Sequence, residues 1–117
     1  MTARVTHARL TSQVLVSALL RRAESDGGFG VVLARGDPTA GAVLVVVVER
    51  GVRALLLERL LQPDGTYAWR DNGRAGTDDA EFAELIARRR RYDPDLWLLE
   101  LDVASAEAFA AAMNAAG

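Results

Sequence analysis

The spacing of apolar and polar residues predicts a helix near the start of the chain. Leu15, Ala18 and Leu19 recur at intervals of one to three residues within Ser12–Ser25, which places them in one stripe of a helix. The glycine pair at residues 27–28 predicts the end of this helix, because glycine readily adopts the backbone conformation that often follows one.

Five further segments have the composition of β-strands, with β-branched and large apolar residues between turn formers. They are residues 29–35, 42–49, 53–61, 66–70 and 96–102. The second is apolar at every position except its terminal glutamate, which predicts a central strand covered on both faces. The third has residues that also suit a helix, but the tight turns on both sides of it favour a strand. The RGDPTAG sequence between the first two has type I turn chemistry and predicts a hairpin.

Residues 77–91 have the clearest helical pattern. Thr77 is expected to cap this helix, and Pro94 to end it, because the residue before proline is pushed out of the helical region. A last helix follows the fifth strand, with Phe109 and Met113 facing inward. The predicted order is helix, four strands, helix, strand, helix. It indicates an α+β fold in which three helices pack on a largely antiparallel sheet of about five strands.

The composition is that of one folded domain, and it excludes several chemistries. We expect residues 1–117 to form a single domain, with a flexible N-terminal segment at 1–11 that contains the only histidine, His7. The chain has no cysteine, and all 14 basic residues are arginine. Thiolate nucleophiles, cysteine-ligated metals, lysine Schiff bases and phosphate-loop lysines are therefore excluded. No cofactor is expected.

Charge and hydropathy indicate a protein that works away from membranes. The net charge of -2 provides no general attraction to nucleic acid or to an anionic membrane. The longest apolar stretch, residues 42–48, is far shorter than the roughly 20 residues that a membrane-spanning helix needs. The absence of cysteine fits the cytosol, so we expect a cytoplasmic location.

The most conspicuous local feature is a run of four arginines, residues 88–91, within RRRRYDPDLWLLEL. Consecutive helical residues are about 100° apart, so four of them fan around about 300° and cannot all face one ligand. Arg89 continues the apolar stripe of the predicted helix and Arg90 flanks it. The other two point outward near Glu84, and Glu84 to Arg88 is a favourable i to i+4 ion pair.

Arg22 is expected to hold the same position on the first helix as Arg89 on the later one. Each arginine would reach the edge of the core, where an unpaired charge costs several kcal/mol. The carboxylates expected to pair with them are Asp37, Asp93, Asp95 and Glu100.

Three interpretations of these arginines remain open. The one that we favour is structural: the arginines complement helix dipoles and form salt bridges. The alternative is that Arg22 and Arg89, with Arg90, form a clamp for a phosphate, a nucleotide or a partner's carboxylate, which guanidinium groups bind in a bidentate manner. A nucleic-acid surface is the least favoured, because the chain is acidic overall and has few aromatic residues for stacking.

Asp93 and Asp95, together with Asp37 or Glu100, could also supply the oxygen ligands that hard metal ions prefer. An Asp-Pro-Asp sequence at the end of a helix is more typical of a turn whose carboxylates accept hydrogen bonds from nearby backbone N–H groups. We therefore predict a turn and no metal site.

Two stretches of the chain resemble a family of small bacterial proteins known as domain of unknown function 1491. They are VSALLRRAESDGGFGVVLARGDPTAGAVL, residues 16–44, and IARRRRYDPDLWLLEL, residues 86–101. The resemblance implies a cytosolic protein of the alphaproteobacteria, and it transfers no catalytic role because the family carries no known activity. The all-arginine run departs from the family pattern, which puts a strict need for four charges in doubt.

The function predicted from the sequence is accordingly general. We expect a small, non-catalytic binding or interaction module that forms a homodimer or acts as an accessory to another protein. The alternatives are an anion-binding or enzymatic domain with an arginine clamp and, less favoured, a weak nucleic-acid binder.

Overall fold

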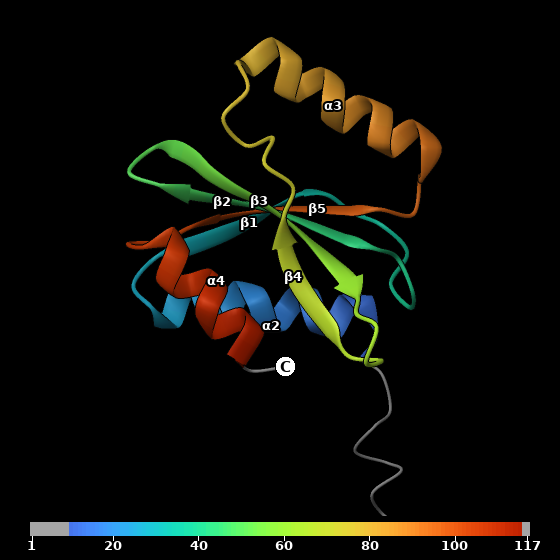
Figure 1. Cartoon of the computed structure of the whole chain (residues 1–117), viewed down its shortest axis with the longest axis horizontal. Helices are drawn as coiled ribbons and strands as arrows, with labels where there is room; N and C mark the ends of the chain where they lie inside the picture. The colour runs from blue at the N-terminus through green and yellow to red at the C-terminus, as the bar shows by residue number, and fades with distance from the viewer. Residues whose placement is uncertain (1–9, 116–117) are drawn as a thin grey trace, which may run out of the picture.

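The structure, a computed structural model that describes residues 10–115, consists of one β-sheet with helices on both faces (Figure 1). In chain order the elements are α2 (Ser12–Ser25), β1 (Phe29–Ala34), β2 (Val43–Glu49), β3 (Val52–Leu61), β4 (Tyr67–Asp71), α3 (Asp79–Tyr92), β5 (Trp97–Asp102) and α4 (Ala106–Ala115). Helices α2 and α4 lie on one face of the sheet, here called the α2/α4 face. Helix α3 lies on the opposite face, here called the α3 face.

The sheet is mixed, and the expectation of a largely antiparallel sheet is wrong. Its strand order is β1-β5-β2-β3-β4, and β5 pairs with β2 in parallel. Antiparallel pairs form between β1 and β5, between β2 and β3, and between β3 and β4. The parallel pair arises because the chain crosses over through β3, β4 and α3 before β5 returns to the centre. A parallel pair requires such a long connection.

The predicted hairpin between the first two strands is also wrong, since β5 lies between β1 and β2. The connecting segment instead wraps around the start of β5. The Asp37 N–H donates to the backbone oxygen of Asp95 over 3.0 Å, and the Trp97 N–H donates to the backbone oxygen of Ala42 over 2.8 Å. Turn residues indicate where a chain bends, but they do not determine which strand fills the gap that the bend leaves.

Other local predictions are confirmed or corrected by one residue. The ambiguous third strand is a strand, and β2 is buried along almost its whole length on both faces. The cap of α3 is Asp78 and not Thr77, because the Asp78 side chain accepts a hydrogen bond from the Glu81 N–H over 2.8 Å. Thr77 instead donates its hydroxyl to the backbone oxygen of Arg74.

The alternation of side chains along β2 and β5 divides the core into two layers. The layer on the α2/α4 face is the larger one, and its members include Val16, Leu19, Val45, Val47, Leu99, Leu101, Phe109 and Met113. The layer on the α3 face consists of Ala34, Leu44, Val46, Val48, Leu56, Ala75, Leu96 and Leu98. Phe82, Leu85 and Ile86 of α3 cover this second layer, but no residue of α3 is itself fully buried.

The predicted flexible segment lies mostly outside the described part of the chain. Residues 1–9, with His7, are not described, whereas Thr11 caps α2 by accepting a hydrogen bond from the Val14 N–H. Among residues 10–115, none of the helices has the length and apolar character that crossing a membrane requires.

Candidate functional site

Arg89 is already paired with a carboxylate that the sequence did not indicate. Its guanidinium lies 3.1 Å from Glu58 on the adjacent strand β3, and both side chains are partly buried. None of the expected carboxylates, Asp37, Asp93, Asp95 and Glu100, forms an ion pair with its guanidinium. The partner was missed because β3 is distant in sequence, and only the sheet register places Glu58 under the end of α3.

The other three arginines of the run differ from one another in their contacts. Arg88 and Arg91 both lie near Glu84, at 3.9 and 3.7 Å, as the helical spacing predicted for Arg88. Arg90 is exposed and makes no ion pair with the carboxylates of residues 10–115. The four arginines therefore have different surroundings, and the run does not form one basic patch.

Arg22 does not reach the edge of the core. The buried residues of α2 include Val16, Leu19 and Ala23, so the buried stripe is rotated from the one predicted and Arg22 is exposed. It also lies on the α2/α4 face, whereas Arg89 belongs to the helix on the α3 face. The structure thus does not bring the two arginines together in one clamp.

The three candidate aspartates are used in turns. One Asp37 carboxylate oxygen accepts hydrogen bonds from the Thr39 and Ala40 N–H groups, at 3.2 and 2.8 Å. Asp93 accepts one from the Asp95 N–H over 3.2 Å. Backbone bonding brings the Asp37 and Asp95 segments together. No group of three or more potential metal-ligating side chains occurs within the described residues.

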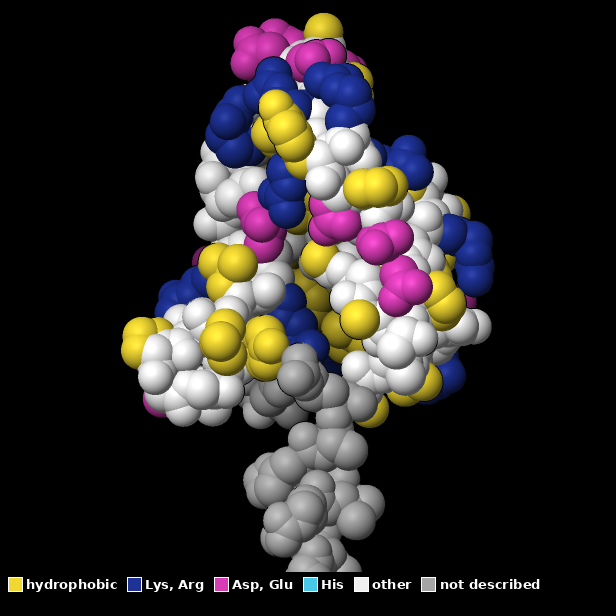
Figure 2. All heavy atoms as spheres, turned by 90° about the vertical axis from the view of Figure 1, so that its right-hand side faces the viewer, with side chains coloured by type: hydrophobic (Ala, Val, Ile, Leu, Met, Phe, Trp, Pro, Cys, Tyr) yellow, Lys and Arg dark blue, Asp and Glu magenta, His cyan; other side chains and the backbone are white. Residues whose placement is uncertain are grey.

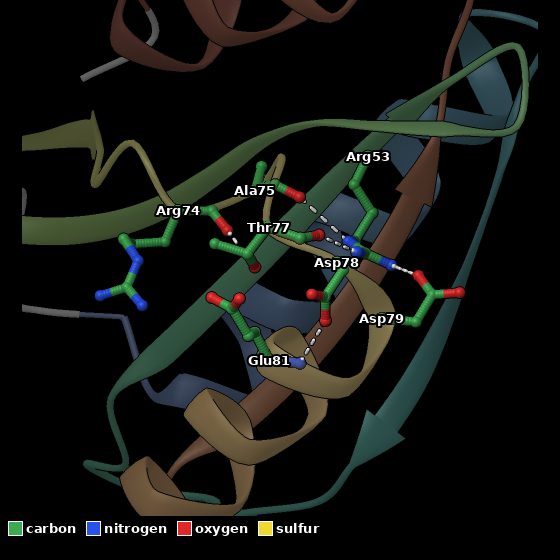
Figure 3. Close-up of polar contacts among 7 residues, drawn as sticks. All are labelled: Arg53, Arg74, Ala75, Thr77, Asp78, Asp79 and Glu81. Carbon is green, nitrogen blue, oxygen red and sulfur yellow. Dashed lines mark hydrogen bonds and ion pairs between the residues drawn. The ribbon is translucent and has the colours of Figure 1, made fainter.

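Arg53 forms the most extensive polar cluster on the α3 face, and sequence reasoning did not single it out (Figure 3). It donates to the backbone oxygens of Ala75 and Thr77 over 3.0 and 2.7 Å, and to the Asp79 carboxylate over 2.9 Å. Its guanidinium carbon also lies 4.2 Å from the centre of the Phe82 ring. The planar fork of arginine is suited to several acceptors at once.

Arg53 and the Arg89–Glu58 pair connect the two ends of α3 to the same strand, β3. The first holds the loop before α3 and its first turn, and the second holds its last turn. Since α3 buries none of its residues completely, these polar contacts add to the packing of Phe82, Leu85 and Ile86 in attaching the helix. Arg53 and Arg89 therefore act in the fold.

On the other face, Arg59 forms no ion pair with the carboxylates of residues 10–115. Arg59 lines a groove of about 540 Å³ with residues 10–12, Leu15, residues 39–43 and Tyr67. Its guanidinium carbon lies 4.6 Å from the centre of the Tyr67 ring. Figure 2 shows the hollow at this end of the molecule, where a basic side chain borders apolar ones.

The two edges of the sheet differ in how accessible they are. At the β4 edge, the Asn114 side chain accepts a hydrogen bond from the Trp69 N–H over 2.7 Å and donates one to the Trp69 backbone oxygen over 3.1 Å. Asn114 thus occupies the place of a neighbouring strand. The β1 edge exposes Phe29, Val31 and Leu33, and within residues 10–115 no side chain hydrogen-bonds to its backbone in this way.

The sequence model of a family described as "Protein of unknown function (DUF1491)" matches residues 10–111. This chain belongs to the DUF1491 family. The match covers nearly all of the described chain, including both stretches on which the resemblance rests. Arg53, Arg59 and the exposed β1 side chains also lie within it.

Solved structures support the same assignment. A crystal structure of a DUF1491 family protein from Caulobacter crescentus CB15 is similar, with a TM-score of 0.75 and 34% identity over 86% of this chain and 94% of that one. An NMR structure of a DUF1491 family protein from the same organism has a TM-score of 0.71 and 36% identity, over 86% and 92% of the two chains.

A protein from A. tumefaciens is also similar, with a TM-score of 0.69 and 32% identity over 88% of this chain and 93% of that one. No curated protein matches the chain. The DUF1491 relatives therefore define the fold, and their descriptions assign no specific function.

Proposed function

We propose that the protein is a non-catalytic interaction module that forms a homodimer by pairing the β1 edges of two copies. The observation that carries this proposal is the row of large apolar side chains on an edge strand: Phe29, Val31 and Leu33 are 59%, 44% and 51% exposed. Contiguous apolar side chains on a free edge are typical of surfaces that pair with another chain.

The row is exposed because helix α3 covers only part of the α3 face of the sheet. Phe29 and Val31 pair with Asp102 and Glu100 of β5, whose side chains point to the α3 face. Ala34 is the only β1 residue in the core layer beneath α3. The part of the strand that precedes Ala34 is not covered in this way, and its side chains Phe29, Val31 and Leu33 meet solvent.

The sequence of β1 suits pairing with itself. An antiparallel arrangement centred on Val31 places Phe29 opposite Leu33 of the second copy, so the apolar side chains of both strands form one continuous surface.

The other edge is a poorer candidate for pairing because Asn114 occupies the backbone groups of Trp69. The interface at β1 is small, so we expect a reversible dimer with a dissociation constant on the order of 10 μM. We further propose that the dimer acts in the cytoplasm, which the lack of cysteine supports.

Sedimentation equilibrium with matched variants tests the homodimer. Val31→Lys places two positive charges opposite each other at the centre of the pair and is expected to abolish dimerisation. Val52→Lys is the control, since Val52 is also an exposed strand valine, at 65% exposure, but lies on β3. Wild-type protein that stays monomeric at about 100-fold above the expected dissociation constant would contradict the proposal.

Cross-linking tests the register independently. The chain has no cysteine, so Val31→Cys introduces one thiol per copy, and the two thiols lie within disulfide range only if the strands pair around residue 31. Mild oxidation should give a covalent dimer with Val31→Cys and little with Val52→Cys. Equal cross-linking of both variants would indicate random collision and a different interface.

A further inference from the structure

We propose that the groove beside Arg59 is a binding site for a small monocarboxylic acid with an apolar body. The groove lies on the α2/α4 face, because Arg59 pairs with Trp69 of the core layer on that face. It opens between the start of α2 and the β3–β4 hairpin (Figure 2). Its volume of about 540 Å³ is within the range of small-molecule pockets.

Among residues 10–115, Arg59 is the only charged residue that lines the groove. It is partly buried, and no carboxylate of residues 10–115 forms an ion pair with it. Residues 1–9 contain no aspartate or glutamate. A partly desolvated guanidinium without a counter-charge favours the binding of an anion.

Tyr67 lies against this guanidinium at the wall of the groove. The stacking of Arg59 on the Tyr67 ring, at 4.6 Å, covers one face of the guanidinium plane. No carboxylate of residues 10–115 pairs with the N–H groups at the edge of that plane, and these groups suit the two oxygens of a carboxylate ligand.

The rest of the lining determines what the anion is attached to. Leu15, Ala42 and Val43 line the groove with apolar surface, which favours a hydrocarbon or aromatic body. Phosphate is a poor fit because the part of the lining formed by residues 10–115 offers no second cation. The first N–H groups of α2 are also already used: those of Ser12 and Gln13 donate to the backbone oxygens of Thr39 and Pro38.

The groove and the β1 row lie on different faces of the sheet, so the two proposals are independent. The experiment follows backbone amide shifts by NMR while the full chain is titrated with octanoate. Octanol is the neutral control with a similar apolar body, and inorganic phosphate is the control for an anion without one. We expect octanoate to shift the amides of residues 10–15, 39–43, Arg59 and Tyr67, and to bind about tenfold more tightly than octanol.

The matched variants are Arg59→Gln and Arg70→Gln. Arg70 lies on the neighbouring strand, but it pairs with Glu58 and therefore points to the α3 face. We expect Arg59→Gln to weaken octanoate binding about tenfold and to leave octanol binding unchanged, whereas Arg70→Gln should bind octanoate within about twofold of wild type.

Three results would overturn the proposal. They are the absence of shifts in these residues with about 10 mM octanoate, equal binding of octanoate and octanol to wild type, and shifts of equal size at the same residues with phosphate. The comparison of octanoate with octanol uses the wild-type chain, so the test does not depend on the folding of any variant.

Discussion

Replacing Arg53 should loosen α3 while leaving the central sheet intact. In Arg53→Met, the fork that connects β3 to the loop before α3 is lost, but much of the aliphatic volume of the side chain is kept. The variant loses two charge-assisted hydrogen bonds to the backbone oxygens of Ala75 and Thr77, at 3.0 and 2.7 Å. It also loses the contact with the Phe82 ring.

The size of the effect follows from these contacts. Hydrogen bonds from a charged donor contribute roughly 1.5–3 kcal/mol each, and an arginine–aromatic contact roughly 0.5–2 kcal/mol. These contributions share one side chain and are not additive, so we expect a loss of about 2–4 kcal/mol in the attachment of α3. The ion pair with Asp79 adds little, because the Asp79 side chain is 97% exposed.

Hydrogen exchange measures this loss directly. Because α3 has no fully buried residue, it should open locally rather than unfold the whole domain. A loss of about 2–4 kcal/mol corresponds to an increase of about 30- to 1000-fold in the exchange rate of the amides of residues 83–92. The exchange rates of the β2 amides should change only as far as the global free energy of unfolding of the variant changes.

Two further variants sharpen the interpretation. Arg53→Lys keeps the charge but not the fork, so it should recover only a minor part of the protection. Asp79→Asn should have a small effect. If α3 exchange in Arg53→Met is unchanged, or if β2 loses as much protection as α3, then Arg53 does not act as a local attachment for the helix.

Three more predictions concern other contacts. A double-mutant cycle of Arg89→Ala and Glu58→Ala, measured by urea unfolding, should give a coupling free energy of about 1 kcal/mol, because this pair is only partly buried; zero coupling would show that the pair is incidental. Gly36→Ala should lower the free energy of unfolding by about 1–3 kcal/mol, since its Cβ would collide with a backbone oxygen of the α3–β5 loop, and an unchanged melting temperature would contradict this. Hydrogen bonds from the Thr66 side chain and backbone lower the pKa of Asp64, so its stabilising contribution is present above the unfolded pKa and lost as pH falls through the folded one. An NMR titration of Thr66→Ala should show the Asp64 pKa moving back up toward its ordinary value, and no movement would assign the shift to another cause.

The candidate sites were only partly visible in the sequence. Helical spacing correctly separated the arginines of 88–91 and paired Arg88 with Glu84. It failed for Arg22, because the stripe chosen from leucines and alanines was rotated from the one that includes Val16 and Ala23. A short helix with small apolar residues on several sides allows more than one inward face.

Arg53 and Arg59 were missed for a different reason. Both lie within the mostly apolar strand β3, where an arginine has no local signal of its role. Which of them receives a partner depends on what the fold places above each face of that strand. The loop before α3 closes over Arg53, whereas the space beside Arg59 remains a groove.

The sequence by itself determined where the chain is helical and where it is extended, because those states depend on periodicity and turn residues within about ten positions. It also indicated that β2 is central, since apolar residues on both faces need cover on both sides. The tertiary structure alone decided that β5 enters the sheet between β1 and β2 and makes it mixed. Strand neighbours are selected by packing between segments that are distant in the chain, and the same packing decided which arginines are paired and which edge of the sheet remains open.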